Sequence, residues 1–164
     1  MYANEDTNVS LRCCLGEDRP FKIDMLTVDG LKVMRLEADV DCLTQNVSIQ
    51  IPPGRPFANI YKAFALMCPS FYVTRADNGE TLFRIDSGIS AVLGSFGSVN
   101  FDVKGADNRS TIGKISKDWS GLARELFTDA DYFGMSVPSD MNVQLKAVLL
   151  AVLFHIDMTF YQKN

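Results

Sequence analysis

Few residues in this chain are suited to acid–base chemistry. His155 is the only histidine among 164 residues, and histidine is the side chain that most readily acts as a general base near neutral pH. It lies in an apolar stretch, and Asp157, two residues further on, falls on a different face of a helix and so does not pair with it. The sequence contains no phosphate-binding loop, nucleophile elbow or metal-ligand cluster. We therefore expect a buried structural histidine and no enzymatic activity.

The sulfur chemistry open to the chain is also limited. The four cysteines are Cys13, Cys14, Cys42 and Cys68, and their spacing is not that of a metal site. The vicinal pair Cys13–Cys14 cannot easily close a disulfide on itself. The polar, acidic start MYANEDTNVS lacks the pattern of a secretory signal, so reduced thiols are expected. S-acylation of Cys13 and Cys14 beside a membrane is the alternative.

The element that must position the histidine is the apolar stretch from Lys146 to Tyr161. Residues 147–154 are all apolar, so a helix here has no polar stripe and must be buried in protein or in lipid. A bilayer span needs roughly 20 apolar residues, and His155 and Asp157 interrupt this stretch much sooner. A core helix is favoured, and a membrane-inserted helix is the alternative. The residues proposed to face the core or the membrane are Ala147, Val148, Leu149, Leu150, Val152, Leu153, Phe154 and Ile156.

Much of the remaining chain predicts antiparallel strands. Apolar and polar residues alternate on both sides of Asp29–Gly30, Asn78–Gly79 and Asp107–Asn108, which is typical of three hairpins. Another strand covers 47–51 and stops at the turn 52–54, Pro-Pro-Gly. A closed sheet would cover the apolar helix and hide its own edges. The sequence therefore predicts one domain, 1–164: a mainly β fold in which an antiparallel barrel encloses a central C-terminal helix.

The charge of the chain limits its partners. A formal net charge of −4 argues against a nucleic-acid partner, because phosphate contacts require clustered lysine and arginine. The same sign disfavours unaided docking on an anionic membrane. A divalent cation would reverse that effect locally.

The segment from Gly113 to Gln162 resembles the C-terminal half of the phospholipid scramblases. Four shorter matches lie upstream: ANEDT at 3–7, the vicinal Cys13–Cys14, RPF at 19–21 and IQIPPGRP at 49–56. The resemblance covers nearly the whole chain. It implies a tubby-like domain, in which a closed antiparallel barrel surrounds one hydrophobic helix. It also implies Ca²⁺-activated, ATP-independent, bidirectional movement of phospholipids between leaflets, at the cytoplasmic face of the plasma membrane or of other membranes.

The resemblance further implies a calcium segment similar to an EF-hand loop. Its proposed Ca²⁺ ligands are Asp129, Asp131, Phe133, Met135, Val137 and Asp140. Gly134 stands at the sixth place, as in an EF-hand, but Phe133 offers only its backbone carbonyl and Asp140 is shorter than the usual glutamate. Any Ca²⁺ site is therefore expected to be weak.

The same segment has a purely structural interpretation. The alternation in 132–137 is typical of a half-buried strand, which Pro138 would end. Ser139 or Asp140 is then placed to cap the final helix. The segment 113–122 is interpreted as a barrel strand, but Trp119, Leu122, Leu126 and Phe127 also fall at helical spacing, so the sequence leaves this segment ambiguous between a strand and a helix.

Three departures from the family pattern affect the expected function. Where the family has a cysteine-rich acylation cluster, this chain has only Cys42, so stable lipid anchoring is not expected. In the segment similar to a nuclear import signal, Asp118 replaces a more basic residue, which argues against nuclear import. The resemblance implies a proline-rich N-terminal extension that recruits partners in several family members, and we expect this chain to lack it. We therefore expect a barrel that is incomplete at its N-terminus, with an open edge through which copies of the chain can associate.

Two functions follow from these observations. The first is that of a lipid scramblase, which requires the final helix to enter a bilayer. The second is that of a tubby-like module that binds membranes or partner proteins and moves no lipid. They differ in whether the final helix leaves its core.

Overall fold

A computed structural model describes residues 2–6, 20–39, 46–63, 68, 70–88, 99–118 and 132–160. Within this part, ten antiparallel strands pair in chain order to form one sheet, and one helix follows them. The strands are β1 (Tyr2–Asp6), β2 (Phe21–Leu26), β3 (Lys32–Asp39), β4 (Asn46–Gln50), β5 (Pro56–Ala63), β6 (Ser70–Arg75), β7 (Thr81–Ser87), β8 (Val99–Lys104), β9 (Thr111–Asp118) and β10 (Tyr132–Ser136). The helix is α3 (Val143–Phe160).

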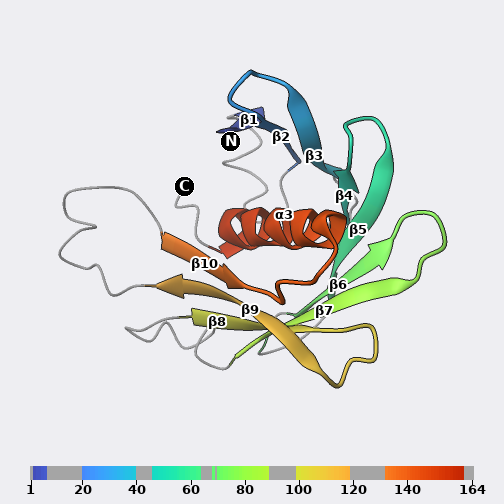
Figure 1. Cartoon of the computed structure of the whole chain (residues 1–164), viewed down its shortest axis with the longest axis vertical. Helices are drawn as coiled ribbons and strands as arrows, with labels where there is room; N and C mark the ends of the chain where they lie inside the picture. Colours follow the sequence, from blue (N-terminus) through green and yellow to red (C-terminus); the bar gives the residue numbers. More distant parts are fainter. Residues whose placement is uncertain are drawn as a thin grey trace.

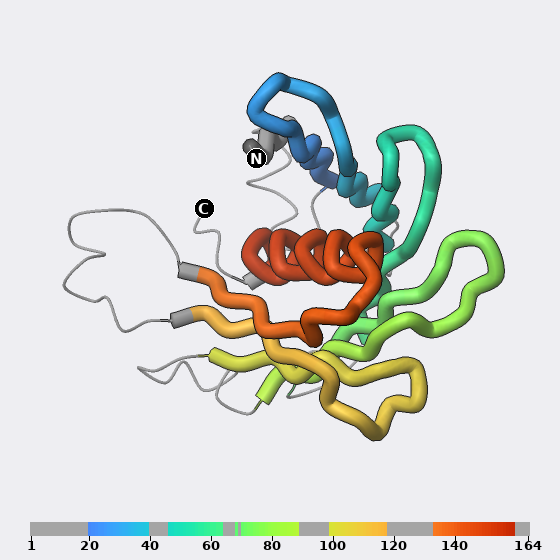
Figure 2. The backbone as a smooth tube through the Cα atoms, viewed as in Figure 1, coloured from blue at the N-terminus to red at the C-terminus, as the bar shows by residue number. Residues whose placement is uncertain are grey.

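The sheet curves round α3, which lies along its concave side (Figure 1). The backbone path in Figure 2 passes from the N-terminal strands, round the helix, to β10 beside it. Strands β1 and β10 are the two ends of the strand order, and no pairing between them closes the sheet in the described part of the chain. The prediction of a mainly β fold that encloses a C-terminal helix and is incompletely closed is therefore confirmed.

The three predicted hairpins are β2–β3, β6–β7 and β8–β9. Gly30 and Gly79 occupy their turns with φ of +79° and +71°, a conformation that glycine adopts without steric cost. Strand β5 was not predicted, because its inward side begins with the small Ala58 and its outward side carries Tyr61, which weakens the apolar–polar alternation. The ambiguous segment is a strand as far as Asp118; Trp119 lies outside the described residues.

Alternate residues of the strands face α3 and form the core. The largest fully buried apolar side chains are Phe71, Phe101, Met25, Leu36, Ile49, Ile60, Ile85, Ile115, Leu149 and Ile156. Burial of each such side chain contributes roughly 1.5–3 kcal/mol, so the contact between α3 and the sheet is a large part of the stability of the fold. No helix among the described residues is long and apolar enough to cross a membrane.

The start of α3 differs from the prediction. The side-chain oxygen of Asn142 accepts a hydrogen bond from the backbone N–H of Gln144 at 2.8 Å, which makes Asn142 the N-cap. The prediction that Ser139 or Asp140 caps the helix is wrong. The reason is that residues 138–141 form a separate turn, closed by a backbone hydrogen bond, before the helix begins.

Strands β9 and β10 approach closely at Gly113. A Cβ atom on this residue would lie 2.5 Å from the backbone oxygen of Ser136. We expect Gly113→Ala to push β10 away from β9 and to lower the free energy of unfolding by roughly 1–3 kcal/mol. Chemical denaturation measures the loss. The control is Gly105→Ala, whose Cβ would meet its nearest atom at an ordinary 3.4 Å; equal stability of the two variants would contradict the prediction.

Candidate functional site

Helix α3 has a fully buried face and a half-buried face. Of the eight residues proposed to face the core or the membrane, the fully buried ones are Val148, Leu149, Val152 and Ile156. The half-buried ones are Ala147, Leu150, Leu153 and Phe154. Leu150, Leu153 and Phe154 are three and four residues apart and therefore share one face, with Lys146 and Asp157 on the same side. The apolar surface of α3 is thus covered most completely on the side that meets the sheet.

His155 is buried in the core, as predicted, with 1% of its surface exposed. Its ring stacks on Phe21, with centroids 6.2 Å apart, and meets the edge of Phe71 at 5.3 Å. The Thr159 hydroxyl lies 3.5 Å from Nδ1, but it already donates a 2.8 Å hydrogen bond to the His155 carbonyl. Burial, with a smaller effect from the charge of Lys62, lowers the pKa of His155 from 6.5 to about 3. A neutral imidazole shut away from solvent in this way is poorly placed for acid–base catalysis.

The calcium segment is described only in its second half. Phe133 and Met135 are half-buried residues of β10, and they pair with Lys117 and Ile115 of β9. Gly134, the sixth residue of the proposed loop, lies in the same extended strand, whereas an EF-hand loop turns sharply at this position. The described half of the segment is therefore a strand and not a coiled loop. The predicted strand interpretation is confirmed for this half.

The remaining proposed calcium ligands lie on either side of β10. Val137 is half-buried next to the strand, and Asp140 is exposed in the turn before α3. Asp129 and Asp131 lie outside the described residues, so a Ca²⁺ site at the start of the strand stays a prediction. The described residues contain no group of three or more His, Cys, Asp or Glu side chains that could hold a metal ion.

The proposed acylation sites, Cys13, Cys14 and Cys42, also lie outside the described residues. Cys68 is described, and it is a half-buried free thiol. Acylation therefore stays a prediction.

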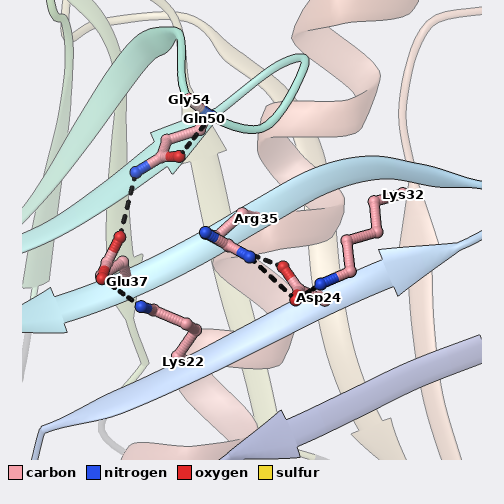
Figure 3. Close-up of polar contacts among 7 residues, drawn as sticks. All are labelled: Lys22, Asp24, Lys32, Arg35, Glu37, Gln50 and Gly54. Carbon is pink, nitrogen blue, oxygen red and sulfur yellow. Dashed lines mark hydrogen bonds and ion pairs between the residues drawn. The ribbon is translucent and has the colours of Figure 1, made fainter.

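The outer face of β2 and β3 carries an ion-pair network that the sequence reasoning missed (Figure 3). The Asp24 carboxylate accepts hydrogen bonds from Arg35 Nε at 2.7 Å and Nη2 at 3.0 Å, and from Lys32 Nζ at 2.7 Å. These bonds, led by that of Arg35, lower the pKa of Asp24 from 3.8 to about 2. The signal for this network was present in the charged residues that alternate with apolar ones along both strands.

The network extends across β4 to the turn that follows it. Glu37 pairs with Lys22 at 2.7 Å and accepts a hydrogen bond from Gln50 at 3.1 Å. Gln50 in turn accepts one from the backbone N–H of Gly54 at 2.7 Å (Figure 3). Because these carboxylates are already bound by cations and amides of the same sheet, the network fixes the strands and offers little to a metal or a substrate.

A second group of ion pairs lies on β7 and β8. Asp86 contacts Arg84 at 2.7 Å and Lys104 at 2.8 Å. Burial alone would raise the pKa of Asp86, but the bonds from Lys104 and Arg84 outweigh it and hold that pKa below the ordinary value. The described residues therefore provide a stabilised sheet and a large apolar helix.

Comparison with known proteins identifies similar chains. The family model described as Scramblase matches residues 1–163. Phospholipid scramblase 1 of Homo sapiens is 36% identical over 170 residues, which cover 99% of this chain and 53% of that protein. Phospholipid scramblase 2 of Bos taurus is 36% identical over 168 residues, covering 98% of this chain and 57% of that protein. Phospholipid scramblase 4 of Homo sapiens is 27% identical over 169 residues, 98% of this chain and 50% of that protein.

This chain thus spans about half the length of these relatives. No solved structure matches it.

Replacement of Asp24 tests the outer network. The carboxylate is 12% exposed, so we expect Asp24→Asn to lower the free energy of unfolding at pH 7 by roughly 1–2 kcal/mol. Because the pKa is lowered in the folded state, this contribution is present above pH 3.8 and is lost as the pH falls towards about 2. Denaturation at several pH values measures it. Asp29→Asn, in the exposed turn between β2 and β3, is the control, and a pH-independent difference between Asp24→Asn and the unaltered protein would count against the prediction.

Protonation of His155 is expected to oppose folding. Its pKa is lowered in the folded state, so above pH 6.5 the histidine is neutral in both the folded and the unfolded protein and does not change the free energy of unfolding. Below pH 6.5 the unfolded protein takes up the proton more readily, and the free energy of unfolding falls as the pH falls. Between pH 7 and pH 5 the protein should lose about 2 kcal/mol more stability than His155→Phe, which keeps an aromatic ring but cannot be protonated. Thermal unfolding in matched buffers measures the difference. Parallel pH profiles for the two proteins would refute this role of the histidine.

Proposed function

Because this chain belongs to the scramblase family, we propose that it moves phospholipids between the two leaflets of a membrane, in both directions, without ATP and in response to Ca²⁺. The observation that carries the proposal is the extent of the likeness: the family model covers residues 1–163, and human phospholipid scramblase 1 aligns with 99% of the chain. No covalent step is required, and the proposal invokes none.

The proposed partners are phospholipids and a membrane surface, at the cytoplasmic face of the plasma membrane or of other membranes. The negative net charge of the chain disfavours an anionic bilayer unless cations bridge the two. The proposed ligands for this cation are the side chains of Asp129 and Asp131 and the backbone carbonyl of Phe133. Acylation of Cys13, Cys14 or Cys42 would strengthen the attachment.

Lipid movement by insertion of α3 has an energetic obstacle. The helix fills the concave side of the sheet with four fully buried residues of the proposed lipid-facing set, Val148, Leu149, Val152 and Ile156. To withdraw it would cost a large part of a domain stability that is typically 5–15 kcal/mol. Contact between the apolar surface of the helix and the lipid must supply that free energy.

The same burial favours a second candidate function. A tubby-like module that keeps α3 in its core could bind membranes or partner proteins and move no lipid. Strands β1 and β10, which end the strand order and do not pair with each other in the described part of the chain, would also allow copies of the chain to pair through their edges. In this case the chain would act as a binding domain.

Reconstitution separates the two candidates. The purified chain is incorporated into liposomes that carry a fluorescent phospholipid, and the movement of the label between leaflets is followed with and without Ca²⁺. We expect Ca²⁺-dependent transport, with the Ca²⁺ requirement raised on the order of tenfold in Asp129→Ala because one charged ligand is lost. Asp29→Ala, on an exposed turn of β2–β3, is the matched control.

Two results would change the conclusion. Binding to the liposomes without movement of the label would favour the second function. Equal transport with and without Ca²⁺ would show that the protein moves lipid but that the calcium site has no role in the mechanism.

A further inference from the structure

The inward side of strand β10 is only partly covered. Phe133 and Met135 point towards the core but are half-buried, as is Val137 just after the strand. On the neighbouring strand β9, by contrast, the inward residue Ile115 is fully buried. Apolar surface is therefore left accessible along β10.

The position of β10 in the sheet accounts for this accessibility. The strand ends the strand order, and β9 is the strand with which it pairs among the described residues. A strand in this position turns the N–H and C=O groups of alternate residues away from its neighbour, where a further strand can pair with them. Such a strand would also cover the half-buried side chains.

Strand β10 lacks the features that usually protect an edge. Proteins blunt edge strands with charged side chains, proline or β-bulges. The segment Tyr132–Ser136 contains neither charge nor proline, and its pairing with β9 runs through all five residues without a shift of register. Strand β1, at the other end of the order, carries Glu5 and Asp6, and the chain has a net charge of −4. Of the two end strands, uncharged β10 is therefore the one that a second copy of this acidic chain can approach with less repulsion.

We propose that β10 pairs with β10 of a second copy of this chain, in antiparallel direction, about a two-fold axis at Gly134. A two-fold axis perpendicular to the sheet makes both copies use the same surface, as in most homodimers, and keeps their inner faces on one side. The axis lies at Gly134 because this register pairs all five residues of the strand, 132–136, with the same five of the other copy.

The register is complementary to itself. On the inner face it sets Phe133 opposite Met135 of the partner subunit, and Met135 opposite the partner's Phe133. Methionine sulfur makes favourable contacts with aromatic rings, so the two pairs would cover the half-buried side chains of both copies. On the outer face two glycines meet at the axis, and β10 brings no charges together.

The proposed dimer is weak and reversible. Pairing through one strand of five residues buries less surface than a permanent dimer requires. The inference does not depend on lipid movement, because the association needs no membrane. If the edge instead stays in contact with solvent, the protein remains a monomer at every concentration.

The test measures the association of the whole chain in buffer without lipid. Sedimentation equilibrium is recorded from about 1 μM to about 1 mM protein. The variants change Gly134, which is exposed on the outer face; a Cβ atom there would lie 3.0 Å from Ser116 Oγ, which can rotate away. Gly134→Lys and Gly134→Glu place like charges opposite each other at the axis. Gly134→Ala is the matched control, because it adds the same Cβ atom without a charge.

We expect a monomer–dimer equilibrium for the unaltered protein and for Gly134→Ala. The dissociation constant should rise roughly tenfold or more in Gly134→Lys and in Gly134→Glu, each measured alone. An equal mixture of these two variants should recover the dimer, because opposite charges then meet at the axis. A change in net charge cannot produce this pattern, since one variant makes the chain less negative and the other more negative.

Four results would overturn the proposal or its register. A monomer at all concentrations up to about 1 mM would overturn the pairing, and association without limit would indicate pairing of β10 with β1 in place of the two-fold dimer. Failure of the mixture to recover the dimer would overturn the axis at Gly134. If a charged variant fails to fold, Met135→Ala decides, because it removes both methionine–phenylalanine contacts; an unchanged dissociation constant in this variant would overturn the register.

Discussion

The fold depends on the need to cover a helix that has no polar stripe. Residues 147–154 are apolar on every side, so α3 can be stable in water only if other elements surround it. The sheet meets this need by curving round the helix (Figure 1), and inward residues of different strands, such as Leu36, Ile60 and Phe101, are fully buried. A flat sheet would cover one face of α3 and leave the rest exposed. The curvature of ten strands is therefore a consequence of the composition of one helix.

The outer face of the sheet helps to fix the register between the strands. Charged residues alternate with the apolar core positions on β2 and β3, and they are arranged in cross-strand pairs such as Asp24 with Arg35 (Figure 3). These pairs favour one register between the strands, because a slip of one residue would bring apolar side chains outward and charges inward. The inner and outer faces thus support the same pairing by different means.

Some polar groups lie inside the sheet, among the apolar core residues. His155 is held neutral by burial, and Ser87 and Lys117 are buried on the inward side of their strands. A core built only for stability would contain apolar side chains at these positions, since buried polar groups cost free energy unless they are matched.

The sequence by itself determined the local structure and the family of this protein. Period-two alternation and the turn pairs Asp29–Gly30 and Asn78–Gly79 specified hairpins, and the apolar run specified a covered helix, because these signals lie within a few neighbouring residues. Only the tertiary structure decided that Asn142 caps α3, that β5 completes the sheet between β4 and β6, and that Lys117 is buried. These features arise from strand order, tilt and register, which join residues far apart in the chain, and no local pattern of residues encodes them.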